Sequence, residues 1–275
     1  MNTVDNKKSV YLVSNILYLI IIIFSLLYFD EYGIVTLIGG FAILSIYGNI
    51  KSEVIAEKCV IKRDKKNIIL FWTSVLGAFA VMFLYYFTEW EFTVKIGNTI
   101  FVPSLWFLYY YIIPIAYMFI EKKVGKSKKN ILPGILVCSF LIIKSIFRIA
   151  INFDSIISYS KISEDIFNIY QIFLWAAVME ELFFRAYLYD FAEKIYGSKI
   201  AVILSSVFFL LIHFNLIDKL IEVNYASIIN FLAIGFLGIL MAVLYKKTRS
   251  ILWCIIFHLV TDDLFTNIVI LIHKI

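Results

Sequence analysis

The sequence predicts an all-α membrane protein, a polytopic bundle of about eight or nine transmembrane helices. Two observations on composition support this fold class: 62% of the 275 residues are hydrophobic and only 16% are charged, and the mean hydropathy is +0.91. Soluble domains hold about 25% charged residues. The third observation is a succession of long apolar stretches, each long enough for a helix to cross a hydrocarbon core of ~30 Å.

Nine such stretches follow one another along the chain. The count falls to eight if the short stretch 33–50 is re-entrant. The first stretch is longer than a signal-peptide core and no small-residue cleavage site follows it, so we expect it to stay as an anchor. The predicted spans are 9–29, 33–50, 68–87, 100–120, 131–151, 166–188, 199–217, 225–245 and 251–272.

Basic residues gather in alternate loops. Eighteen lie in the N-terminal segment and in the loops on its side of the membrane, and only four lie on the other side. Because basic residues favour the cytoplasmic side, this predicts a multi-pass protein with a cytoplasmic N-terminus. The net charge of +5 then reflects topology and contact with anionic lipid, and it does not indicate nucleic-acid binding. A Lys-, Ile- and Asn-rich composition suggests an AT-rich bacterial genome, so a bacterial plasma membrane is the predicted location.

The basic loop 121–130 is the best internal boundary of the chain. The four spans before it carry no convincing intramembrane charge, whereas the five after it carry several ionisable residues. We therefore expect residues 1–130 to form an accessory group of helices and residues 131–275 to form the working core. The three cysteines share no metal-type spacing and are interpreted as small apolar residues.

Six ionisable residues that fall in three motifs lie inside predicted spans of the second half. An ionisable side chain at the bilayer centre costs at least a few kcal/mol, so it marks a functional site or one half of a pair. The residues fall in three motifs: Glu180-Glu181-Leu-Phe-Phe-Arg185, Phe209-Leu-Leu-Ile-His213 and His258-Leu-Val-Thr-Asp262.

Helical spacing predicts which residues of the first motif meet. Residues four apart share a face of an α-helix, whereas adjacent residues point about 100° apart. Glu181 and Arg185 can therefore pair, and the pair neutralises an arginine that would be costly alone in lipid. Glu180 points elsewhere and is left as the free carboxylate, able to take and return a proton.

The other two motifs each place both defining residues on one helical face. At ~1.5 Å per residue, Glu180, His213, His258 and Asp262 all come in or near the middle third of the bilayer, so the three faces could converge. A structural role is the alternative. A single intramembrane histidine often serves as a hydrogen-bond donor between helices, and Asp262 could cap an irregular stretch.

At these motifs the sequence resembles the CPBP intramembrane protease family, also called the Abi or type II CAAX prenyl endopeptidase family. That family is marked by Glu-Glu-x-x-x-Arg, then Phe-x-x-x-His, then His-x-x-x-Asn or Asp, on successive core helices. All three motifs occur here in that order. The resemblance covers roughly residues 165–270 and leaves the first four spans unmatched.

The resemblance implies a hydrolase, a peptidase that cleaves a membrane-embedded or lipid-associated peptide or protein. Glu180 would be the general base that activates water, and His213 would orient that water. His258 together with Asp262 would stabilise the oxyanion. The supporting residues would be Glu181, Arg185 and Phe209.

Asp262 leaves the question of a cofactor open. An asparagine could donate a hydrogen bond to an oxyanion, but an ionised Asp262 can only accept one. It would instead hold His258 or bind a metal, as in a metalloprotease with zinc on His213, His258, Glu180 and Asp262. We slightly favour a metal-free glutamate mechanism.

Two alternatives belong to other functional classes. The buried glutamate and histidines could form the relay of a proton-coupled transporter, although no inverted repeat or pair of broken spans marks a substrate site. The chain could also be a non-catalytic scaffold or a bacteriocin-immunity protein.

Overall fold

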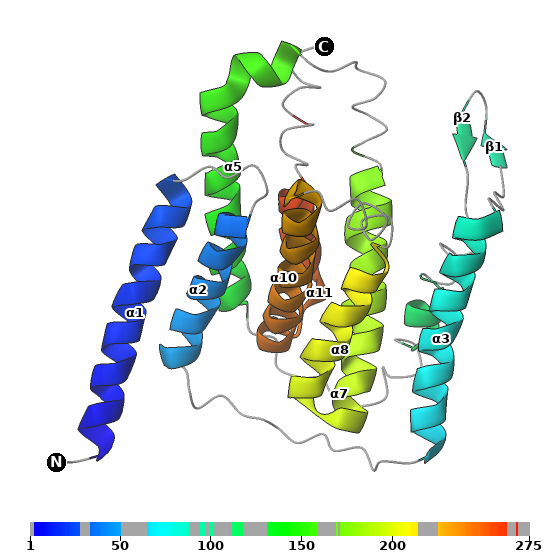
Figure 1. Cartoon of the computed structure of the whole chain (residues 1–275), viewed down its shortest axis with the longest axis horizontal. Helices are drawn as coiled ribbons and strands as arrows, with labels where there is room; N and C mark the ends of the chain where they lie inside the picture. Colours follow the sequence, from blue (N-terminus) through cyan, green and yellow to red (C-terminus); the bar gives the residue numbers. More distant parts are fainter. Residues whose placement is uncertain are drawn as a thin grey trace.

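Figure 1 shows the computed structural model, in which the described residues form a bundle of helices and one small β-hairpin. The structure describes residues 3–27, 34–50, 65–88, 94–96, 99–101, 110, 112–117, 131–158, 169, 171–213, 225–262 and 268. The predicted helical class is confirmed over these residues. The long helices outside the matched core motifs are α1 (Thr3–Leu27), α2 (Ile34–Ile50), α3 (Lys65–Thr88) and α5 (Leu132–Ser158).

The hairpin is a difference from the all-α prediction. Strand β1 (Val94–Ile96) pairs in antiparallel with β2 (Thr99–Phe101). The predicted span 100–120 therefore begins on a strand, and within it the structure describes helical residues at 110 and over 112–117. The apolar count alone did not register the hairpin.

The remaining predicted spans coincide with helices, with shifted ends. Helix α5 continues seven residues past the predicted end at residue 151, and its backbone departs from helical geometry at Asn152. Helix α8 (Ser198–Leu211) and helix α11 (Ile251–Thr261) both end well before the predicted limits of their spans. In the described residues two helical segments are long and apolar enough to cross a membrane, Leu132–Phe153 and Ile228–Thr248. The count of eight or nine spans stays a prediction.

The helix that carries the first motif is wound more widely than an α-helix. Its two π-helical stretches, Gln171–Glu180 and Leu182–Tyr189, meet at Glu181 and lead directly into α7 (Asp190–Tyr196). A π-helix bonds residue i to i+5, and such turns are frequent at functional sites. More residues per turn bring adjacent side chains closer in direction. This lets Glu180 and Glu181 face one neighbour together.

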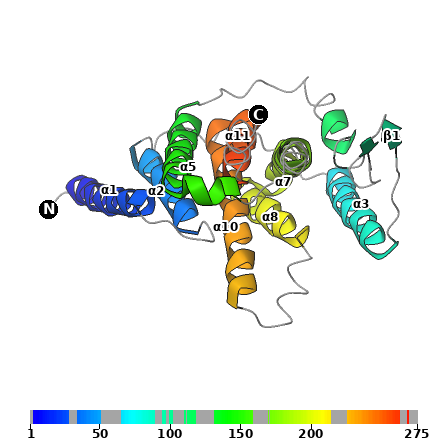
Figure 2. The same cartoon turned by 90° about the horizontal axis from the view of Figure 1, so that it is seen from above.

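Helix α10 (Tyr225–Thr248) lies between α8 on one side and α2, α5 and α11 on the other (Figures 1 and 2). Small residues allow the close approaches. A Cβ at Gly40 would lie 3.2 Å from Leu240, and one at Gly134 would overlap the Trp253 indole. Helix α2 thus packs directly on the helices of the predicted core, although it belongs to the predicted accessory part.

Helix α3 makes side-chain hydrogen bonds to the second π-helical stretch of the motif-bearing helix and to α7, which continues it. The Ser74 and Tyr187 hydroxyls share a hydrogen bond, and Trp72 Nε1 donates to the Tyr196 hydroxyl at 2.8 Å. The division at residue 130 stays untested, but the described helices of the first part make direct contacts with those of the second.

Candidate active site

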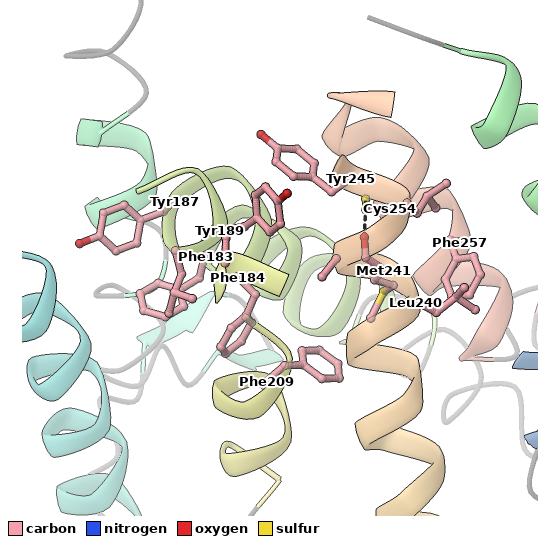
Figure 3. Close-up of a cluster of buried hydrophobic side chains, with 14 of the residues drawn as sticks. Phe183, Phe184, Tyr187, Tyr189, Phe209, Leu240, Met241, Tyr245, Cys254 and Phe257 are labelled. Atoms are coloured by element: carbon pink, nitrogen blue, oxygen red, sulfur yellow. Dashed lines mark hydrogen bonds between the residues drawn. The ribbon is translucent and has the colours of Figure 1, made fainter. Parts of the chain in front are cut away.

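The core around the motifs is aromatic. Phe184 on the π-helical turn meets Phe209 on α8 edge to face, with ring centroids 5.4 Å apart. Both side chains are fully buried. In Figure 3 these rings lie beside the α10 residues Leu240 and Met241, which face Cys254 and Phe257 of α11. The polar residues of the motifs therefore lie among closely packed, water-excluding side chains.

The predicted pair forms inside this core. Arg185 Nη1 donates to Glu181 Oε1 at 2.9 Å, and both side chains are 0% exposed. Arg185 Nη2 also donates to the carbonyl of Gly238 on α10 at 3.3 Å, and the guanidinium carbon lies 4.6 Å from the centre of the Phe209 ring. The arginine thereby ties three helices together.

The close packing of α10 against α8 leaves little room for a side chain at Gly238. A Cβ at Gly238 would lie 3.1 Å from the Phe209 ring and 3.3 Å from the Ser206 carbonyl oxygen. Its position against Phe209 and Ser206 of α8 gives this glycine a packing role. The carbonyl bond to Arg185 was not foreseen.

His258 lies between the two carboxylates of the first motif. Its Nδ1 is 3.0 Å from Glu181 Oε1, and its Nε2 is 3.9 Å from Glu180 Oε2. Nε2 is also 3.4 Å from Asp262 Oδ2, one helical turn away. The imidazole is 3% exposed. The structure therefore brings together five of the predicted residues: Glu180, Glu181, Arg185, His258 and Asp262.

This contact corrects the separation of Glu180 from Glu181 that α-helical spacing predicted. The wider π-helical turn places both carboxylates at the same imidazole, on opposite nitrogens. Glu181 is consequently bound to Arg185 and to His258 at once. Glu180 Oε2 is buried and has no hydrogen-bond partner in the described part of the chain.

His213 occupies the turn just after α8. Its Nδ1 lies 2.9 Å from the backbone oxygen of Phe209. The Phe209 ring centroid is 5.0 Å from that of His213 and 6.0 Å from that of His258. The second motif is thus joined to the other two through its phenylalanine, which contacts both imidazoles and the guanidinium.

Residues 162–263 match the family described as Type II CAAX prenyl endopeptidase Rce1-like. This segment is similar to that family. The match contains all three motifs and α8, α10 and α11, so it confirms the resemblance that the motifs indicated. No curated protein and no solved structure was found to match the chain.

The description of the matched family names an endopeptidase. The similarity of residues 162–263 to it, together with the two long apolar helices, indicates a protease of the membrane. The bacterial origin and the orientation of the N-terminus stay predictions. Residues 1–161 lie outside the family match.

The donor set gives little support to the predicted metal site of this CAAX endopeptidase-like segment. In the described ranges no group of three or more His, Cys, Asp or Glu side chains is arranged to hold one ion. His258 Nδ1 faces Glu181, and His213 Nδ1 faces a backbone oxygen. We therefore derive no step through a metal.

A second polar cluster lies at the opposite end of the same helices and was missed by sequence reasoning. It consists of Asp190 and Glu193 on α7, Arg249 between α10 and α11, and the Tyr189 and Tyr245 hydroxyls. Burial raises the pKa of the Asp190 carboxyl to about 6, although the Arg249 charge opposes this. Two acidic residues, three apart, beside a basic loop were the signal in the sequence that could have revealed the cluster.

Proposed function

We propose that this protein is an endopeptidase that hydrolyses a peptide bond within the membrane, toward its cytoplasmic half. The substrate class is a membrane-embedded or lipid-associated peptide or protein. The observation that best supports the proposal is the Glu180 carboxylate, whose Oε2 is buried, has no hydrogen-bond partner among the described residues and lies 3.9 Å from His258 Nε2. A lone carboxylate beside an imidazole is suited to activating a water molecule.

In the proposed reaction, water bound beside Glu180 attacks the carbonyl carbon of the scissile bond. Glu180 takes one proton from the water as the new C–O bond forms. The carbonyl oxygen becomes an oxyanion, and the His258 ring N–H donates to it. When the C–N bond breaks, Glu180 gives its proton to the leaving amine. The products are one carboxylic acid, which keeps the second water proton, and one amine, and Glu180 is ionised again.

His258 suits the electrophilic role because acceptors face both of its ring nitrogens. Glu181 accepts from Nδ1 and Asp262 lies at Nε2, so these carboxylates favour the doubly protonated imidazolium, in which both nitrogens donate. Asp262 acts here as an acceptor that holds the ring. An ionised aspartate can fill this role where the family pattern also allows asparagine.

The proposed role of His213 is to orient the attacking water. Its Nδ1 faces the Phe209 carbonyl oxygen, which can only accept a hydrogen bond. In the neutral ring Nδ1 therefore carries the proton, and Nε2 has a lone pair that can accept from water. Phe209 contacts both this ring and the His258 ring.

We propose that the reaction needs no metal. The support is the arrangement of the donors, in which Glu181 and a backbone oxygen occupy one nitrogen of each imidazole. The chemistry above uses only groups of this chain and a water molecule.

The test is hydrolysis of a peptide library by the purified full chain in lipid vesicles. Wild type is compared with Glu180→Gln and with Asp5→Asn, a carboxyl-to-amide change on α1 outside the family match. Loss of a general base lowers the rate by about 10²–10⁴-fold, and Asp5→Asn is expected to cleave like wild type. Cleavage by Glu180→Gln at the wild-type rate would overturn the proposal.

A further inference from the structure

The second polar cluster joins the two helices that form the candidate site. Arg249 Nη1 and Nη2 donate to the two carboxylate oxygens of Glu193 at 2.5 and 2.7 Å, and Nη1 lies 3.7 Å from Asp190 Oδ1. Glu193 and Asp190 lie on α7, which continues the helix of Glu180 and Glu181. Arg249 precedes α11, the helix of His258.

The backbone at Arg249 is held in an unfavourable conformation. Its φ of +52° lies in the left-handed region, and within the described ranges no other residue except a glycine has a positive φ. Side chains with a Cβ rarely adopt this region, whereas glycine does so freely. An arginine at this turn indicates that its side-chain contacts outweigh the backbone preference.

Tyrosines complete the cluster. The Tyr189 hydroxyl donates to Glu193 Oε1 at 3.2 Å, and the Tyr245 hydroxyl donates to Asp190 Oδ2 at 3.1 Å. The Arg249 guanidinium carbon lies 5.7 Å from the centre of the Tyr189 ring. Both acidic side chains are therefore held from two directions, and the Arg249–Glu193 pair has a fixed, bidentate geometry.

The same two helices carry a second tie at the site. One tie joins Arg249 to Glu193, and the other joins His258 to Glu181. Because the later residue of one helix contacts the earlier residue of the other, the two helices run antiparallel. His258 is nine positions after Arg249, which corresponds to ~13 Å along a helix. A slide of ~2 Å across the 3.0 Å bond between His258 and Glu181 would lengthen it to ~3.6 Å, beyond hydrogen-bond range.

We propose that the Arg249–Glu193 pair is a positioning clamp, which sets the register of the His258 helix against the helix of Glu180 and Glu181. Arg249 and Glu193 act on the reaction only through the placement of His258. The inference rests on the proposed peptidase function for its effect on rate, but the placement of His258 can be measured without any substrate.

The experiment compares Arg249→Gly, Glu193→Gln and the double variant in the purified full chain. Lys246→Gln is the matched control, because it removes an exposed positive charge from the end of the same helix, α10. Reaction of His258 with diethylpyrocarbonate is followed by peptide mass spectrometry, and kcat, KM and Tm are measured on the same samples. Arg249→Gly is informative because glycine relieves the backbone at φ +52° while it removes the clamp.

We expect His258 to react several-fold faster in both single variants, and kcat to fall roughly tenfold or more with little change in KM, since a ~1 Å misplacement can cost about 10²-fold. The double variant should equal the single variants, because both remove one interaction. Arg249→Gly should keep the wild-type Tm within about 4 °C.

Unchanged His258 labelling in Arg249→Gly and Glu193→Gln overturns the clamp, whatever the peptidase assay gives. Loss of activity that follows the fraction unfolded, with a lowered Tm in Arg249→Gly, shows a purely structural role and also overturns it. If Arg249→Gly does not fold, Glu193→Gln decides, since it keeps the shape of the side chain. If His258 is labelled faster in the variants while the wild-type protein shows no peptidase activity, the clamp is supported and the proposed function is rejected.

Discussion

The substitution Glu181→Gln removes the negative charge of the buried pair and keeps the shape of the side chain. Glu181 Oε1 accepts from Arg185 at 2.9 Å and from His258 at 3.0 Å. A glutamine oxygen can keep both bonds, and its amide nitrogen would occupy the place of Oε2, a buried atom without a hydrogen-bond partner in the described structure. The substitution therefore leaves the fully buried Arg185 without its counter-charge.

The magnitude follows from the 2.9 Å separation of Arg185 Nη1 and Glu181 Oε1. Two unit charges at that distance attract by about 6 kcal/mol at an effective dielectric constant of 20. Breaking a buried pair by removing one partner costs about 3–5 kcal/mol. At about 2–4 °C per kcal/mol for a chain of this size, the Tm should fall by about 6–20 °C.

Heated, detergent-purified samples analysed by size exclusion give the Tm. Glu193→Gln is the control, because that carboxylate is 21% exposed in its pair with Arg249; solvent screens this pair more than the fully buried one, so its loss should lower the Tm less. Removing both charges with Glu181→Gln and Arg185→Met should restore part of the lost stability. A Glu181→Gln protein that melts within about 2 °C of wild type refutes the reasoning.

Three further predictions concern packing, pH and metal. Gly238→Ala should lower stability by about 1–3 kcal/mol, because its Cβ would lie 3.1 Å from the Phe209 ring. Gly235→Ala, whose Cβ would have its nearest neighbour at 3.5 Å, should be neutral or stabilising. Equal Tm values for the two variants would contradict this prediction. Burial raises the pKa of Asp190 from its ordinary 3.8 to about 6, so its contribution to stability is lost as the pH rises from about 4 to 6. Asp190→Asn should therefore raise the free energy of unfolding above pH 6 by about 1 kcal/mol, at most about 3, with no gain near pH 4, as urea titrations at both pH values can show. Activity should survive incubation with EDTA and with a membrane-permeant zinc chelator, and loss that added zinc restores would contradict the metal-free mechanism.

The sequence predicted most helices but not where they end. Hydropathy reports which residues tolerate lipid, and the run after Ser198 stays apolar beyond the last helical residue, Leu211. Backbone can leave the helix at membrane depth where protein surrounds it. His213 lies in such a turn. The predicted span 199–217 is thus helical as far as Leu211 and turns at residues 212 and 213, and its last four residues lie outside the described part of the chain.

Local pairs of the site were predictable and distant ones were not. Glu181–Arg185 and His258–Asp262 are four residues apart, so helical geometry alone brings them together. The bond from His258 to Glu181 joins residues 77 apart in sequence. Its formation depends on the packing of α11 against a π-helical turn, which no local pattern in the sequence revealed.

Arg185 explains why one of two adjacent glutamates is suited to chemistry. Its guanidinium donates to Glu181 and to the Gly238 carbonyl, and it lies over the Phe209 ring, so it is fixed on the side of Glu181. Glu181 in turn orients His258 through Nδ1. The opposite nitrogen is then directed toward Glu180, whose Oε2 has no hydrogen-bond partner among the described residues. Two chemically identical side chains thus differ because the arginine neutralises only one, and under the proposed mechanism the stability of the fold and the reactivity of the site depend on different carboxylates.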